Sequence, residues 1–172
     1  MLAERLSGLA LLALALTGSV TSAESSKAPV KLAVFNFELQ DDTPASALLN
    51  QATSSATSIE RVSREARRVL AQSGRYQVID VSSLNPDPAK GKTFSTCNGC
   101  EAGIALQLGA DQSAIGVVQR ATQTDYYIVI RIRDARTGKV LDQQEANFAG
   151  SEEGWPTGVR MLIQHQLLVD RE

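Results

Sequence analysis

The chain has 172 residues, of which 43% are hydrophobic and 21% are charged, and its formal net charge at pH 7 is -2. This balance excludes a wholly disordered chain, a collagen-like repeat and a multi-pass membrane protein, and the lack of a positive excess makes nucleic acid a poor partner. One histidine and two cysteines leave few ways to build a metal site or a nucleophile–histidine pair.

The first 23 residues have the features of a secretory signal peptide. A short basic start is followed by apolar residues from Leu6 to Leu16, and then by small and polar residues that end at Ala23. Eleven helical residues rise about 16 Å, roughly half the hydrocarbon thickness, so a membrane anchor is the weaker interpretation. We therefore expect a signal peptide at 1–23, a secreted or periplasmic location without a stable membrane anchor, and one α/β domain at 24–172.

The first half of this domain reads as strand, helix and strand. Val30 to Phe37 is apolar on both faces, which is typical of a central strand. Glu38 to Pro44 is expected to be an acidic loop, in which Asp41 and Asp42 precede a helix rather than form a general acid–base pair. Residues 45–72 should form that helix, with an apolar face that includes Ile59, Val62, Ala66 and Val69. We interpret the arginines between these positions as a solvated helix surface, not a nucleic-acid site.

The second half predicts a meander of strands followed by a helix. The expected elements are a strand at 76–81, a loop at 82–92, a short helix at 101–108, strands at 114–120, 126–133 and 140–148, and an amphipathic helix at 152–168. Ile128, Ile130 and Ile132 should point inward from the alternating strand. The expected fold class is α/β (α+β): a single mixed sheet of about five strands packed against two main helices and one or two short ones.

The outward positions of the same strand are a candidate partner surface. Tyr127, Arg131 and Arg133 place an aromatic ring beside two guanidinium groups, and such residues are enriched in protein interfaces. Outward arginines are also ordinary on a solvated sheet face, so both interpretations stay open at this point.

The two cysteines form the sharpest local motif. In an oxidising compartment, Cys97 and Cys100 should form one intrachain disulfide, because there is no third thiol and Asn98-Gly99 tolerates a tight turn. We expect this bridge to be structural, although a thiol close to a helix start could have a redox role. Glu101 in place of histidine excludes a c-type haem attachment site.

Other chemistry has little support in the sequence. The single histidine, His165, lies on the last predicted helix with no partner that the spacing nominates as nucleophile or orienting group. Two thiols and one distant imidazole fall short of the four ligands of a closed zinc site, and no glycine-rich phosphate loop is present. We therefore expect no enzyme activity, no resident metal and no cofactor.

Several segments, taken in order, resemble a bacterial family of secreted proteins of unknown function. These segments are Phe35–Phe37, Gly74–Asp80, Cys97–Glu101, Leu108–Asp111 and Trp155–Leu168. Residues 108–140 also resemble the core of periplasmic domains of the TolB N-terminal, CsgG, LpoB and FlgT type. The resemblance implies a TolB-N-like fold and an accessory protein that docks onto a larger envelope partner. The alternatives are a redox protein that uses the two cysteines, and a small-ligand carrier or an accessory factor of a periplasmic quinoprotein dehydrogenase system.

Overall fold

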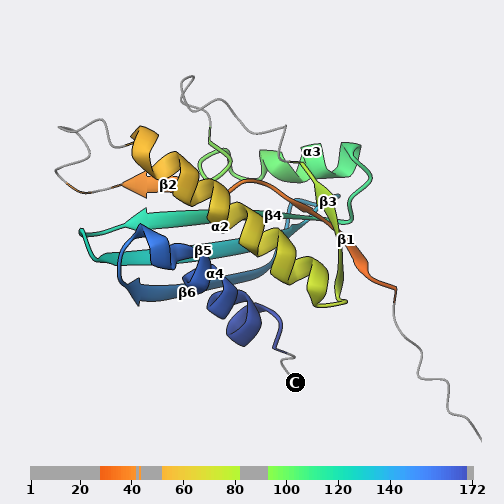
Figure 1. The fold of residues 1–172 in the computed structure, drawn as a ribbon. Helices are drawn as coiled ribbons and strands as arrows, with labels where there is room; N and C mark the ends of the chain where they lie inside the picture. Colours follow the sequence, from red (N-terminus) through yellow and green to blue (C-terminus); the bar gives the residue numbers. More distant parts are fainter. Residues whose placement is uncertain (1–27, 42, 44–51, 82–92, 170–172) are drawn as a thin grey trace, which may run out of the picture.

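The computed structural model describes residues 28–41, 43, 52–81 and 93–169, which build a mixed sheet of six strands (Figure 1). The strands are β1 (Val30–Val34), β2 (Glu38–Asp41), β3 (Tyr76–Asp80), β4 (Gln112–Arg120), β5 (Asp125–Asp134) and β6 (Val140–Ala149). Their order is β3-β1-β4-β5-β6, and β2 pairs with β4 beyond the end of β1. β1 is parallel to β3 and β4, whereas β4, β5 and β6 form an antiparallel meander.

The prediction of one strand from Val30 to Phe37 followed by an acidic loop is wrong in detail. β1 ends at Val34, and the chain rejoins the same neighbour, β4, as β2 in the segment expected to be a loop. At the break, the backbone N–H of Phe37 donates to Ser63 Oγ at 2.9 Å, and Arg67 Nε donates to the Val34 carbonyl at 3.1 Å. Side chains of the following helix thus satisfy backbone groups that the ladder releases, which gives six strands where about five were expected.

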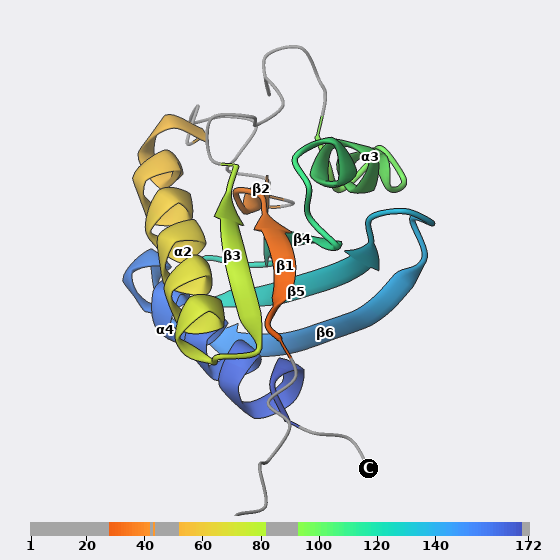
Figure 2. The same cartoon turned by 90° about the vertical axis from the view of Figure 1, so that its right-hand side faces the viewer.

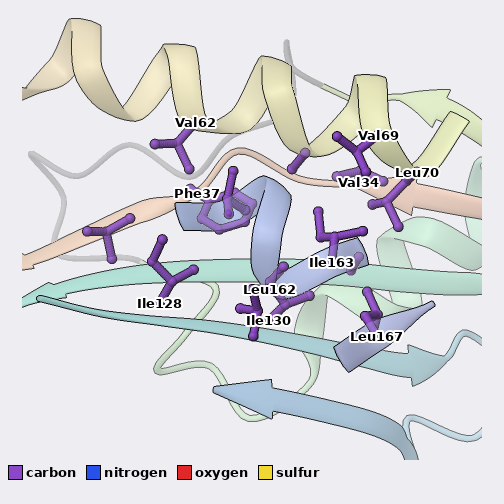
Figure 3. Packing of buried hydrophobic residues seen from close by; sticks show 14 of the residues in the cluster. Val34, Phe37, Val62, Val69, Leu70, Ile128, Ile130, Leu162, Ile163 and Leu167 are labelled. Atoms are coloured by element: carbon purple, nitrogen blue, oxygen red, sulfur yellow. The ribbon is translucent and has the colours of Figure 1, made fainter. Parts of the chain in front are cut away.

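The two main helices cover one face of the sheet, here called the inner face. They are α2 (Ala52–Gln72) and α4 (Trp155–Leu162), and α4 is preceded by a 3-10 turn, Glu152–Gly154, and extended by a π turn, Ile163–Leu167. The predicted inward residues Ile128, Ile130 and Ile132 are at most 2% exposed. Figure 3 shows side chains of both helices meeting those of β5 in this core. The predicted packing of both helices on the sheet is confirmed.

The short helix α3 (Cys100–Gln107) lies on the opposite, outer face (Figure 2). It packs over one end of the sheet, where Ala33, Phe35 and Ile115 belong to a second, smaller apolar cluster with Phe94 and Ala105. Farther along β4 and β5, Val117, Tyr127 and Val129 are only half-buried. The outer face is therefore covered more completely at the α3 end than along the rest of the meander.

Some sequence predictions fall on residues outside the described part. These are the signal peptide at 1–23, Asp42, the first residues of the expected helix at 45–72 and the loop at 82–92. Among the helices that are described, none is long and apolar enough to span a membrane.

Candidate functional site

The predicted disulfide joins Cys97 to Cys100, with their Cα atoms 5.6 Å apart. The turn between them places Asn98 at φ 53° and Gly99 at φ 102°, so both residues adopt the left-handed conformation for which this pair is suited. Cys100 is the first residue of α3 and is exposed, whereas Cys97 is half-buried. A soluble thiol therefore meets Cys100 more readily than Cys97.

A buried ion pair supports the disulfide turn from below. Glu101 is 0% exposed, and its Oε1 atom lies 3.1 Å from Arg133 Nε. Arg133 also donates from its NH1 group to the Gly138 carbonyl at 2.9 Å, which connects α3 to the β5–β6 hairpin. A Cβ atom on Gly99 would lie 3.7 Å from the guanidinium, an ordinary contact distance, so the disulfide turn lies directly over Arg133.

Arg133 does not belong to the accessible partner surface that the alternation predicts. It lies on the outer face as expected, but it is only 9% exposed because the disulfide turn and Glu101 cover it. Alternation along a strand gives the face of a side chain and not the elements that pack over that face.

The other two predicted surface residues are more accessible. Tyr127 and Arg131 are half-buried, and Arg131 Nε donates to the neutral side chain of Gln143 on β6 at 2.7 Å. Within the described residues no carboxylate forms an ion pair with Arg131. Its positive charge is therefore available to a partner.

Three buried polar atoms beneath the disulfide turn lack a hydrogen bond in the described part of the chain: Glu101 Oε1, Arg133 Nε and Ser113 Oγ. The first two face each other at 3.1 Å, which is an ion-pair distance, but the N–H does not point along a hydrogen-bond direction. Ser113 is the cross-strand neighbour of Arg133 and is 1% exposed. Because buried polar groups are nearly always satisfied, this concentration of orphaned atoms calls for a chemical explanation.

Sequence reasoning missed a second buried charge cluster, at the far end of the sheet. Arg120 closes β4 and is 5% exposed. Its guanidinium forms ion pairs with Asp41, at 2.9 Å, and with Glu152, donates to Ser55 Oγ at 3.2 Å, and lies 5.1 Å from the centre of the Trp155 ring. Burial alone would raise the pKa of Asp41, but hydrogen bonds from Thr43 and the charge of Arg120 outweigh it and hold that pKa below its ordinary value.

A polar cavity of about 290 Å³ opens beside this cluster. Its wall includes Thr122, Asp125, Ser151 and Glu153, together with the rings of Tyr126 and Trp155. The two acids are engaged within the wall, because Thr122 Oγ1 donates to Asp125 at 2.7 Å and the Ser151 hydroxyl donates to Glu153. None of the orphaned atoms found in the described residues lines this cavity.

The remaining candidates from the sequence are not brought together. His165 is exposed on the last turn, and Asp41 pairs with Arg120. The residues on which a helix cap by Asp41 would depend lie outside the described part of the chain. The sequence held no signal for the Arg120 cluster, because its members are distant in the chain and each looks like an ordinary polar residue at the end of an element.

The model of a family described as protein of unknown function (DUF2380) matches residues 30–167. The chain belongs to this family. The match spans the six strands and three α-helices found in the described part of the chain. No curated protein matches the chain in sequence.

Several solved structures of bacterial proteins are similar to this fold. PelC of Paraburkholderia phytofirmans, a dodecamer, is similar with a TM-score of 0.52 and 17% identity over 84% of this chain and 90% of PelC. The LpoB C-terminal domain of Salmonella enterica has a TM-score of 0.44 and 16% identity, covering 74% of this chain and 87% of that domain. TolB of Acinetobacter baumannii has a TM-score of 0.49 and 14% identity, covering 81% of this chain and 28% of TolB. The expected α/β fold, a single mixed sheet packed against helices, is confirmed.

Proposed function

We propose that this family member is a secreted, periplasmic docking protein without catalytic activity of its own. Its outer sheet face binds an amphipathic segment of another envelope protein. The observation that carries this proposal is a half-buried apolar stripe beside a charge that has no ion-pair partner among the described residues of the chain. The stripe consists of Val117, Tyr127 and Val129, and the charge is that of Arg131.

The chemistry of the face selects the kind of partner. Val117 and Val129 are register partners on β4 and β5, so their side chains lie side by side on the outer face beside Tyr127. Arg131 is two residues farther along β5 and has only a neutral hydrogen-bond partner. A segment that places apolar side chains on the stripe and a carboxylate on Arg131 would bury both features at once. A hydrophobic anchor beside a positive charge thus favours an acidic amphipathic segment over a purely charged one.

Site-specific crosslinking tests this proposal in the periplasm. A photoreactive benzoylphenylalanine at position 127 should give one discrete adduct with another envelope protein, whereas the same residue at exposed position 64 on α2 should not. After identification by mass spectrometry and purification of that protein, Arg131→Glu should weaken its binding at least about tenfold, the effect of about 1.4 kcal/mol. Arg136→Glu makes the same change in net charge on the exposed hairpin and should leave binding unchanged.

Three results would overturn the proposal. The first is the same set of adducts from positions 127 and 64, and the second is equal binding by the Arg131→Glu and Arg136→Glu proteins. The third is an adduct of twice the chain mass, which would assign the face to a second copy of this chain. Replacing the partner's contacting acidic residue by a basic one should restore binding to the Arg131→Glu protein. This rescue distinguishes loss of a direct contact from a change in folding.

A further inference from the structure

We propose that the chain, once its disulfide is reduced, binds one Zn²⁺ ion through Cys97, Cys100 and Glu101. This inference is independent of the docking face, because it concerns the disulfide turn at the start of α3. The sequence alone favoured no metal site, since it offered two thiols and one distant histidine. The structure adds a third ligand, the carboxylate of Glu101, which in the sequence only marked the absence of a haem-binding histidine.

The distances suit a tetrahedral zinc shell. The two sulfur atoms and a carboxylate oxygen of Glu101 all lie within 4.8 Å of one another. Cys97 Sγ is 3.7 Å from Glu101 Oε2. Two tetrahedral ligands at zinc–sulfur and zinc–oxygen lengths of about 2.3 and 2.1 Å are about 3.6 Å apart, so this pair already has the required separation. On reduction the two sulfur atoms must move apart to about 3.8 Å, and a Cys-x-x-Cys turn is the common zinc-binding spacing.

The orphaned polar atoms are an independent indication. Glu101 is completely buried, and its Oε1 atom has no hydrogen bond in the described part of the chain. Arg133 Nε and Ser113 Oγ, which lie beneath the same turn, share this property. Glu101 Oε1 and Arg133 Nε form an ion pair without a hydrogen bond, and Ser113 Oγ has no partner in the described residues, so this buried place has unused hydrogen-bonding capacity. A zinc ion on the other carboxylate oxygen would bring a bound water molecule as its fourth ligand, and the oxygen of that water, not the cation, would be the acceptor for such donors.

The charges also balance. Two thiolates and the Glu101 carboxylate carry three negative charges, and Zn²⁺ with the Arg133 guanidinium carries three positive charges. In the disulfide form, Glu101 and Arg133 neutralise each other at 3.1 Å. The buried group is therefore neutral in both states, so zinc binding requires no net charge to be transferred into the interior.

The reaction that opens the site needs a dithiol reductant. A thiolate of the reductant attacks the exposed Cys100 sulfur, and its second thiol resolves the mixed disulfide. The reductant becomes a disulfide, and its two electrons and two protons convert the Cys97–Cys100 bond to two thiols. Zn²⁺ then displaces both thiol protons to solvent and forms two zinc–sulfur bonds. Bound zinc in turn protects the sulfurs from reoxidation.

Cobalt and zinc titrations test the site. The secreted chain is reduced without oxygen and titrated with Co²⁺, which should give sulfur-to-cobalt charge-transfer absorption and tetrahedral visible bands that saturate at one ion per chain. Zn²⁺ should then displace the cobalt, and competition with a chromophoric chelator gives its affinity. The Cys97→Ser/Cys100→Ser protein should show neither signal. Glu101→Gln should weaken Zn²⁺ at least about tenfold, the lower end of the loss seen for supporting groups at metal sites. Glu145→Gln, an exposed acid on β6, should have no effect.

Zinc X-ray absorption of the reduced wild-type chain decides the question even if Glu101→Gln fails to fold. A shell of two sulfur and two oxygen atoms supports the assignment. A shell without sulfur, or one with four sulfurs shared between two chains, overturns it. So does equal affinity of the wild-type and the folded Glu101→Gln protein, or the absence of charge-transfer absorption in the reduced wild type.

Discussion

Replacing Arg120 by methionine should cost this protein a large part of its stability. The arginine side chain is 6% exposed, and its partners Asp41 and Glu152 are 11% and 28% exposed. Methionine fills a similar volume and keeps contact with the Trp155 ring, but it leaves two largely buried carboxylates without their common cation. The penalty therefore comes from the stranded acids more than from lost packing.

The expected loss in the free energy of unfolding is about 3–5 kcal/mol, the usual cost of breaking a buried ion pair by removing one partner. For a chain of this size, each kcal/mol lowers the thermal midpoint by about 2–4 °C, so the midpoint should fall by roughly 10 °C. The Arg64–Glu60 pair is the matched control, since its side chains are 69% and 68% exposed. Arg64→Met should cost less than about 0.5 kcal/mol.

Urea unfolding followed by circular dichroism measures both losses, and a triple variant identifies their origin. Arg120→Met combined with Asp41→Asn and Glu152→Gln removes the stranded charges, so it should be more stable than Arg120→Met alone. A loss below about 1 kcal/mol for Arg120→Met would place the cluster in the range of surface pairs and refute the argument. A triple variant less stable than the single one would refute it as well.

Three further predictions concern the core, the turn and pH. Gly116→Ala should lower the free energy of unfolding, measured with urea, by about 1–3 kcal/mol, because the new Cβ atom would lie 2.2 Å from the Phe37 ring. The control Gly103→Ala, on α3, adds a Cβ atom with nothing within 4 Å and should stabilise the fold slightly. Replacing both Cys97 and Cys100 by serine should cost only about 2 kcal/mol, since the closed loop is short, and a loss of folding would contradict this. Because the pKa of Asp41 is lowered in the folded chain, its ionised carboxylate stabilises the fold above about pH 3.9, and this stabilisation is lost as the pH falls further. Asp41→Asn should therefore make the free energy of unfolding less dependent on pH in this range.

Local patterns predicted the parts of the fold that depend on periodicity. The alternation of β5 placed Ile128, Ile130 and Ile132 in the core, where they are at most 2% exposed. Helical spacing likewise identified Val62 and Ala66, which are at most 1% exposed. Each of these residues is buried because its own element turns an apolar side toward the sheet, and a sequence records that directly.

Features that depend on contacts between distant segments could not be read in this way. The break after β1 exists because Ser63 and Arg67, which lie on α2, supply hydrogen-bond partners for residues 34 and 37. The apolar pattern of residues 30–37 does not predict a break after residue 34. The position of Glu101 could not be predicted from local pattern either. Its carboxylate is buried beside the two cysteines because Arg133, which is distant in the sequence, forms an ion pair with it.

Three arginines of the meander differ in burial and in the partners of their guanidinium groups. Arg120 and Arg133 are both buried, and each faces a carboxylate from another part of the chain. Arg131 points to the same outer face as Arg133, but it lies beyond the cover of the disulfide turn, and among the described residues its hydrogen-bond partner is the neutral side chain of Gln143. A buried guanidinium requires a neutralising acid within the fold, so the first two charges are committed to stability. No acid in the described part of the chain forms an ion pair with Arg131, and under the proposed function it is therefore the arginine of this face that an acidic partner would bind.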